Sequence, residues 1–288
     1  MRSESPVRGL LAGPRAPRCA GMKRFLPFLP QDPLVPVVRL SGMIAASGRV
    51  GATLNDASLA PVLERAFARG KPKAVALQIN SPGGSPVQSS LIAARIRRLA
   101  DQHKVPVHAF VDDVAASGGY WLAAAADHIW VDECSIVGSI GVISAGFGFH
   151  ELIDRYGIER RVHTAGTSKS FLDPFRPERE EDVERLRRVL EQLHVAFKAH
   201  VTDRRAGKLP EGQDLFTGDY WAGRQSVELG LADGVAHLVP KMKEIYGDKV
   251  RLVPMGIRKP LFQRLGAQLA GAALAGAEER ALLARYGL

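Results

Sequence analysis

Two continuous apolar runs, residues 73–80 and 105–111, constrain the fold of this chain more than any other feature. Neither run alternates regularly with polar residues, which is typical of strands covered on both faces. Each run leads into a glycine-rich turn and then into a segment with apolar side chains at helical spacing. Because strands and helices alternate, the sequence predicts βα units around a largely parallel sheet, an α/β fold.

The same patterns predict the remaining elements. We expect further strands at 34–44, 128–131, 136–144 and 158–163, and helices at 55–69, 87–102, 122–126, 151–156 and 177–205. The last helix carries an apolar stripe that we expect to be buried, formed by Leu186, Val189, Leu190, Leu193 and Phe197. Residues 217–235 end in a helix stop and a turn into a strand.

Three regions are expected along the chain. Residues 1–33 form a basic, proline-rich leader that we expect to be disordered, with Met22 as an alternative start. Residues 34–257 form the folded domain, and residues 258–288 an amphipathic helical tail. The leader lacks the apolar core of a secretory signal, and no segment is long and apolar enough to span a bilayer. These features favour a cytoplasmic protein.

The net charge of +9 resides at the two ends. Residues 1–24 hold six basic residues against one acidic, and residues 251–288 hold six against two, so the body is neutral. Basic ends of this kind favour solvent or acidic lipid at a membrane surface over nucleic acid. Cys19 and Cys134 make no disulfide framework, and no Cys/His cluster has the spacing of a metal site. We expect neither a metal nor another cofactor.

A serine lies at the mouth of the turn that follows the second apolar run, in the sequence DVAASGGYW at 113–121. A serine between a strand and a helix presents its hydroxyl beside the N–H groups of the helix start, as a nucleophile beside an oxyanion site requires. Ser-Gly-Gly is also a common turn and capping sequence. Ser117 is therefore a candidate nucleophile whose assignment depends on its partners.

A hydroxyl nucleophile needs a base. None of the eight histidines lies in a glycine-rich loop with a well-placed acidic partner. A lysine serves if burial lowers the ordinary lysine pKa near 10.4 by several units. Lys169 lies in a Gly/Thr/Ser loop, where an exposed surface lysine is the alternative interpretation. The turn at 80–84 offers backbone N–H groups for an anion, but it lacks the Gly-Lys-Ser/Thr ending of a nucleotide site.

Four motifs occur in order: NSPGG at 80–84, ASGGY at 116–120, VGSIGV at 137–142, and SKS at 168–170 with DPF at 173–175. Together they resemble the signal peptide peptidase A family in its short bacterial form, over residues 35–239. Members are serine proteases with a Ser/Lys dyad. The resemblance implies a Clp/crotonase-like fold with repeated ββα/βα units.

The resemblance also implies the roles of individual residues. Ser117 attacks the peptide carbonyl and Lys169 takes its proton, while the N–H groups of Gly84 and Gly118 hold the oxyanion and Ser139 orients the lysine amine. It implies a homo-oligomer that cleaves signal-peptide remnants or unfolded polypeptides without metal or nucleotide. Many relatives carry an N-terminal membrane anchor, which is not seen here. We therefore expect a cytoplasmic peptidase that touches the membrane through its basic ends.

Three alternatives remain open at this point. A crotonase-like enzyme acting on acyl-CoA thioesters would share the oxyanion loops but normally uses carboxylates, and the turn carries Ser117. A Clp-type Ser-His-Asp protease would need a histidine near position 142, which is Val142. A non-catalytic scaffold of the same fold is the third alternative, against which Ser117 and Lys169 argue.

Overall fold

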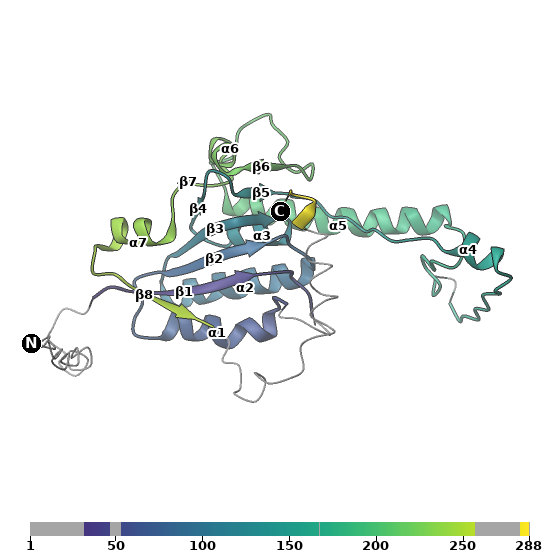
Figure 1. Cartoon of the computed structure of the whole chain (residues 1–288), viewed down its shortest axis with the longest axis horizontal. Coiled ribbons are helices and arrows are strands. Elements are labelled where there is room, and N and C mark those ends of the chain that lie inside the picture. Colours follow the sequence, from purple (N-terminus) through teal and green to yellow (C-terminus); the bar gives the residue numbers. More distant parts are fainter. Residues whose placement is uncertain (1–31, 47–52, 167, 257–282, 288) are drawn as a thin grey trace, which may run out of the picture. The chain divides into compact units, whose positions relative to one another are not determined.

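A mostly parallel sheet forms the centre of the unit Pro33–Leu288 (Figure 1). The computed structural model describes residues 32–46, 53–166, 168–256 and 283–287. The strands are β1 (Leu34–Ser41), β2 (Val75–Ser81), β3 (Val107–Ala116), β4 (His128–Val131), β5 (Ile136–Gly138), β6 (Tyr220–Ala222), β7 (Gly234–Val235) and β8 (Arg251–Met255). The helices are α1 (Asp56–Ala68), α2 (Pro86–His103), α3 (Gly118–Ala124), α4 (His150–Arg155), α5 (Glu180–Arg204), α6 (Gly223–Glu228) and α7 (Leu238–Tyr246).

The order of the strands places β3 in the middle of the sheet. The path is β6-β5-β3-β2-β1-β8, with β4 between β3 and β7. Only β5 and β6 pair antiparallel. The first part of β3 pairs with β4 and its last residues pair with β5, so that Ala116 lies opposite Gly138. The expected α/β fold, a largely parallel sheet flanked by helices, is confirmed.

The two faces of the sheet pack against different helices. Side chains alternate between faces along a strand, so Val38 and Leu40 of β1 point to one side and Val35 and Val37 to the other. The first pair belongs to the large core shared with α1, α2 and α3. The second pair belongs to a smaller cluster that α7 covers through Met242. Continuous apolar strands are required because both faces are covered.

A buried histidine lies on the α7 side of the sheet. His108 of β3 accepts a hydrogen bond at Nδ1 from the indole of Trp130, at 3.3 Å, and its Nε2 lies 3.0 Å from the hydroxyl of Tyr246. Its ring stacks on that of His128, with centroids 5.0 Å apart. Burial, together with the neighbouring His128 and Lys241, lowers the pKa of His108 to about 4. The ring is therefore neutral at physiological pH.

Local signals place α1 and α2 where the sequence predicts them. The side chain of Asn55 accepts a hydrogen bond from the Ser58 N–H at 2.9 Å and so caps α1. Ser85 caps α2 in the same way, and Pro86 occupies its first turn, where a missing N–H has no cost. Both helices begin within one residue of the predicted position.

One predicted strand is absent, and the bounds of another strand and of one helix differ from the prediction. Residues 158–163 form no strand, because no strand in the described ranges pairs with this segment. The strand expected over 136–144 ends at Gly138, where Ser139 takes a left-handed φ of 53°. The helix expected at 122–126 starts earlier, at Gly118. Helix α7 and strand β8 were not predicted, because short elements carry too few residues to show a period.

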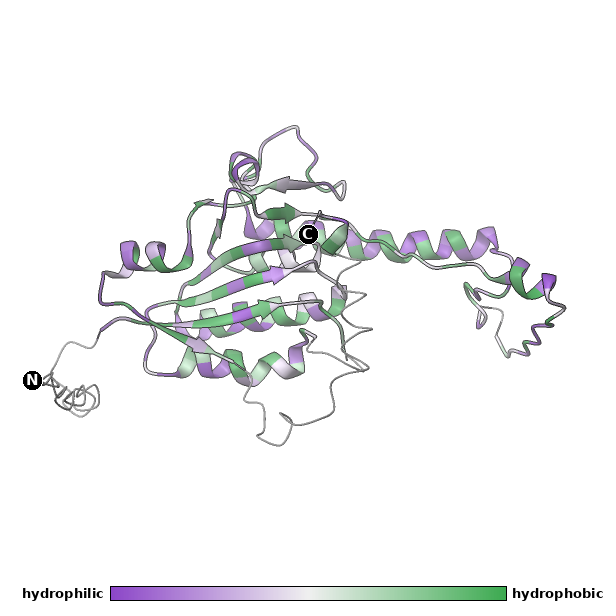
Figure 2. Ribbon diagram, viewed as in Figure 1, coloured by the Kyte–Doolittle hydropathy of each residue, from purple (hydrophilic) through white to green (hydrophobic). Residues whose placement is uncertain are grey.

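The apolar stripe of α5 is not buried along its whole length, contrary to the prediction from the sequence. Of its five residues only Phe197 is buried, and its ring stacks on Trp121 of α3 with centroids 4.6 Å apart. Val201 is buried in the same half of the helix. Nearer the N-terminus, Val189 is 47% exposed. Figure 2 shows apolar and polar residues interspersed along this uncovered part of α5. Among the described residues, the stripe is therefore covered only at its C-terminal end.

Some expectations fall outside the described residues. The leader, apart from Asp32 and Pro33, and residues 258–282 of the tail are not described. The division of the chain into leader, domain and tail therefore stays a prediction. Across the described ranges, no helix combines the length and apolar character that crossing a membrane requires.

Candidate active site

The backbone at Ser117 is strained. Ser117 follows β3 directly and precedes the first residue of α3, with φ 52° and ψ −122°. Such a conformation costs a non-glycine residue about 1–3 kcal/mol and persists only when the surroundings impose it. Here they do, because the Ser117 N–H donates to the Gly138 carbonyl at 2.8 Å and its own carbonyl accepts from the Trp121 N–H at 3.0 Å. The half-buried serine is thus fixed at the carboxyl end of the sheet.

A glycine loop after β2 lies against this turn. Gly83 and Gly84 have φ values of 101° and 139°, which only glycine adopts readily. A Cβ placed on Gly83 would lie 2.8 Å from the Ser117 Cβ and 2.8 Å from the Gly118 nitrogen. The loop is anchored by the buried Ser81 hydroxyl, which donates to the Gly42 carbonyl and accepts from the Gly83 N–H. Strand β2 therefore delivers a backbone loop into contact with the Ser117 turn.

Two N–H groups at this junction have no acceptor within the described chain. The bonds that hold the loop use the Gly83 carbonyl, which accepts from Ile44, and the Ser85 N–H, which donates to the Ile44 carbonyl. Among described residues, the N–H groups of Gly84 and Gly118 form no hydrogen bond. Gly118 is the first residue of α3, where the partial positive charge of the helix start is concentrated. The arrangement suits a developing negative charge on an oxygen.

Ser139 lies immediately after β5, one residue beyond the Gly138 that accepts from Ser117. Its N–H donates to the Asp219 carbonyl at 2.6 Å. Its hydroxyl accepts from the hydroxyl of Tyr286 at 3.2 Å, a partner that the sequence did not suggest. No pattern signals a contact across 147 residues. The structure therefore brings together Gly84, Ser117, Gly118 and Ser139.

Lys169 is the predicted site residue that the chain does not bring to the others. It lies in the connection between α4 and α5, exposed, with its N–H donating to the Gly166 carbonyl at 3.2 Å. In the part of the chain that the structure describes, its amine forms no hydrogen bond or ion pair. Helix α4 lies at the end of α5 remote from α3 (Figure 1). A dyad within one chain is not formed here.

No histidine takes the place of the missing base. All eight are described, and none forms a hydrogen bond with Ser117. His194 and His200 of α5 contact backbone carbonyls instead. Their Nε2 atoms lie 3.2 Å from the Ile140 carbonyl and 3.0 Å from the Trp121 carbonyl, respectively. They attach α5 to the loop after β5 and to α3. A Ser-His-Asp arrangement is therefore not supported.

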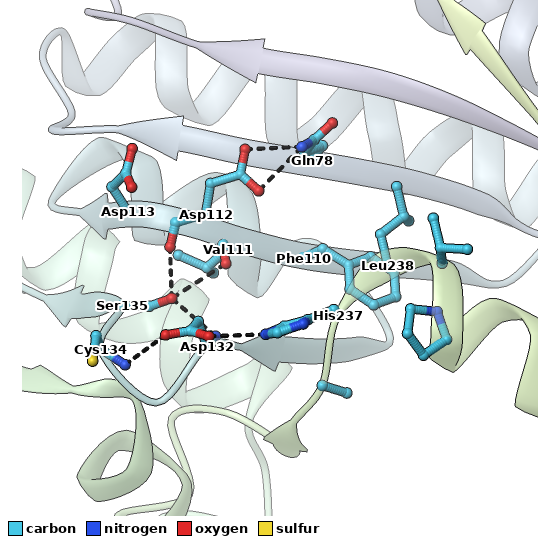
Figure 3. Close-up of a pocket in the computed structure, with 13 residues that line it drawn as sticks. Gln78, Phe110, Val111, Asp112, Asp113, Asp132, Cys134, Ser135, His237 and Leu238 are labelled. Atoms are coloured by element: carbon cyan, nitrogen blue, oxygen red, sulfur yellow. Dashed lines mark hydrogen bonds and ion pairs between the residues drawn. The ribbon is translucent and has the colours of Figure 1, made fainter.

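A separate hollow of about 580 Å³ lies beside β3 and does not include Ser117 (Figure 3). Its polar groups are paired with one another: Gln78 donates to the Asp112 carboxylate, and His237 Nε2 lies 2.8 Å from the Asp132 carboxylate. The N–H of Cys134 and the His237 side chain hold the pKa of Asp132 below its ordinary value. Within the described ranges, no group of three His, Cys, Asp or Glu side chains is placed to hold a metal ion.

Comparison with known proteins identifies the family. The model of peptidase family S49 matches residues 99–245, about half of the chain. This chain belongs to peptidase family S49. A Brucella melitensis protein named Na⁺/H⁺ antiporter NhaA is 47% identical over 286 residues, which are 93% of this chain and 39% of that protein.

Two other relatives of this S49 chain have protease names. Haemophilus influenzae probable protease SohB is 31% identical over 198 residues, 67% of this chain and 54% of that protein. Enterococcus faecium putative signal peptide peptidase SppA is 30% identical over 168 residues, 57% of this chain and 48% of that protein. The chain spans about two fifths of the length of the Brucella relative and about half of the other two. The family resemblance expected from the motifs is confirmed.

The S49 match covers most of the candidate site. Ser117, Gly118, Ser139 and Lys169 lie inside residues 99–245, whereas Gly84 lies before them. The loop that carries Gly84 nevertheless contacts the Ser117 turn directly. The roles of these residues stay predictions, which the geometry makes specific enough to test.

Proposed function

We propose that this S49 chain is a serine endopeptidase with a Ser/Lys dyad, in which Ser117 is the nucleophile and Lys169 the base. The observation that carries the proposal is the strained backbone of Ser117 at the start of α3, beside two N–H groups that have no acceptor among the described residues. Turns of this kind hold a side-chain hydroxyl exposed next to an oxyanion site.

The proposed reaction begins at the Ser117 hydroxyl. The Ser117 Oγ attacks the carbonyl carbon of the scissile bond while its proton passes to Nζ of Lys169. The carbonyl oxygen gains negative charge and accepts hydrogen bonds from the N–H groups of Gly84 and Gly118. When the C–N bond breaks, the lysine returns the proton to the leaving amine. Water then attacks the acyl-enzyme, giving up one proton through the same lysine, and restores the Ser117 hydroxyl.

We propose that Lys169 reaches this site from a second copy of the chain. The segment that carries Lys169 exposes large apolar side chains, with Phe147 81% exposed and Tyr156 72% exposed. On helix α5, which follows that segment in the chain, Val189 is also exposed. Apolar side chains gathered on one segment usually mark an interface. A homo-oligomer would cover them and bring the Lys169 of one copy towards the Ser117 of the next.

A mixing experiment tests the dyad and its assembly together. Ser117→Ala and Lys169→Ala chains are each expected to be inactive. Refolded as a mixture, they should regain about a quarter of the wild-type turnover of an unfolded protein, because random assembly joins an intact serine to an intact lysine at about one site in four. Complementation that stays at zero, with mixed oligomers verified by mass, would refute the exchange of Lys169 between copies.

A labelling experiment isolates the role of the lysine. A serine-directed phosphonate should modify Ser117 in the wild type and react far more slowly with Lys169→Ala, because the hydroxyl then lacks a base. Lys249→Ala, an exposed lysine elsewhere in the chain, is the matched control. Equal labelling rates in all three proteins would rule out Lys169 as the base. An unlabelled wild type would favour the scaffold alternative.

For the substrate, we propose unfolded polypeptides, including remnants of signal peptides. The name of the Enterococcus relative supports the second class. We further propose a cytoplasmic location with peripheral membrane contact through the basic ends. Casein should be cleaved faster than a folded protein of similar size, and a synthetic signal peptide should compete with casein. Cleavage limited to folded substrates would contradict this choice.

A further inference from the structure

The described end of the chain contacts the candidate site through one side chain. Tyr286 is half-buried, and its hydroxyl donates to the Ser139 Oγ at 3.2 Å. Its ring packs edge-on against Tyr220, with centroids 5.2 Å apart. Tyr220 is the β6 residue that pairs with Gly138. The phenol is thus held at the ring and at the hydroxyl, both against the β5–β6 pair.

The backbone of Ser139 is already fixed by other contacts. Its N–H donates to the Asp219 carbonyl at 2.6 Å and its carbonyl accepts from the Gly141 N–H at 2.9 Å. Its φ of 53° is maintained by these bonds. Its side-chain torsion remains to be set, and within the described residues Tyr286 is the hydrogen-bond partner of the hydroxyl.

We propose that Tyr286 is a positioning residue for the peptidase reaction and acts through Ser139. The inference rests on the proposed function. A serine hydroxyl has one hydrogen to donate and two lone pairs. When one lone pair accepts from Tyr286, the hydroxyl is held in one orientation and its hydrogen stays available to the lysine amine. A donor to a neutral amine favours the unprotonated state that a base requires, and the accepted bond strengthens that donor.

The test removes one hydroxyl and keeps the ring. Tyr286→Phe should lower kcat about five-fold and leave KM unchanged, which is the effect expected for one hydrogen bond made in the reaction. The acid limb of the pH–rate profile should move to higher pH by about half a unit. Tyr220→Phe is the matched control, because Tyr286 contacts the ring of Tyr220. It should leave both quantities at wild-type values. Equal melting temperatures of the variants would confirm that folding is intact.

A double-mutant cycle separates positioning from a structural role. In a Ser139→Ala background, Tyr286→Phe should have no further effect on kcat or on the pH profile. The same five-fold loss in both backgrounds would overturn the proposal. A Tyr286→Phe variant with wild-type kinetics would also overturn it. So would one with raised activity, since that would mean that the segment carrying Tyr286 obstructs the site. The wild-type protein must first show turnover that is lost in Ser117→Ala. If it shows none, the result counts against the proposed function instead.

Discussion

The N–H of Ser117 donates to the carbonyl oxygen of Gly138 at 2.8 Å, which joins the end of β3 to the end of β5. Ser139 follows Gly138 directly, so the residue next to Ser139 is the one that holds the Ser117 backbone. The same bond fixes the strained serine from the β5 flank of β3, whereas the Gly83–Gly84 loop lies on the β2 flank. Two β-strands and one loop therefore define the nucleophile position, and each can be tested separately.

The strain at Ser117 predicts opposite effects on stability and activity. Ser117→Ala keeps the strained φ and should lose at least about 1,000-fold in turnover with little change in unfolding free energy. Ser117→Gly should be equally inactive but more stable by about 1 kcal/mol, because glycine adopts these angles without strain. Urea unfolding and peptide turnover measure the two effects. A glycine variant less stable than the alanine variant would contradict the strain argument.

The contact between Gly83 and Ser117 predicts a steric effect at the site. Gly83→Ala would place a methyl group 2.8 Å from the Ser117 Cβ, so the turn must shift. We expect a loss of about 3 kcal/mol in stability and a drop in kcat of at least about ten-fold. Gly212 also has a positive φ, of 80°, but nothing lies within 4 Å of a Cβ there. Gly212→Ala should cost only about 1 kcal/mol and no activity, and an equal loss in both variants would assign the effect to backbone strain alone.

The uncovered stripe of α5 predicts a defect in assembly. Val189→Glu would place a charge in the proposed interface and should shift the protein towards monomer in analytical ultracentrifugation, with parallel loss of activity. Val239→Glu makes the same change at a residue of similar exposure, 50% against 47%, on α7. That control should keep the wild-type mass and turnover. A monomeric wild type with full activity would remove the case for a second copy.

Protonation of His108 predicts a loss of stability in mild acid. Its pKa is about 4 in the folded chain and near 6.5 when unfolded, so the unfolded state binds more protons between these values. The contribution is fully present above pH 6.5 and is lost as the pH falls towards 4, by about 3 kcal/mol at most. Urea unfolding at pH 7 and at pH 4.5 should show this difference. It should shrink in His108→Gln and persist in His103→Gln, a change at an exposed histidine.

The sequence predicted the parts of the fold that local chemistry determines. Asn55 indicates the start of α1, the apolar spacing of residues 87–102 indicates α2, and the apolar runs before Ser81 and Ser117 indicate two central strands. The motifs also brought together Gly84, Ser117, Gly118 and Ser139, because the carboxyl ends of neighbouring parallel strands meet at one edge of a sheet.

The remaining features depend on contacts that no local pattern contains. Residues 158–163 have strand-like composition, but a strand needs a partner, and the described part of the chain offers this segment none. The period of α5 correctly predicted a helix, yet a period cannot tell whether its apolar side is covered by the same molecule. The link from Tyr286 to Ser139 depends on two distant segments meeting, which a single sequence does not reveal.

The position of Lys169 on an exposed segment has a consequence for the cell, given the proposed assembly. A newly synthesised subunit would behave as its own zymogen, harmless to the nascent chains around it until several copies have accumulated. Proteolysis would then rise steeply with expression level rather than in proportion to it, and no propeptide or inhibitor would be needed to delay it.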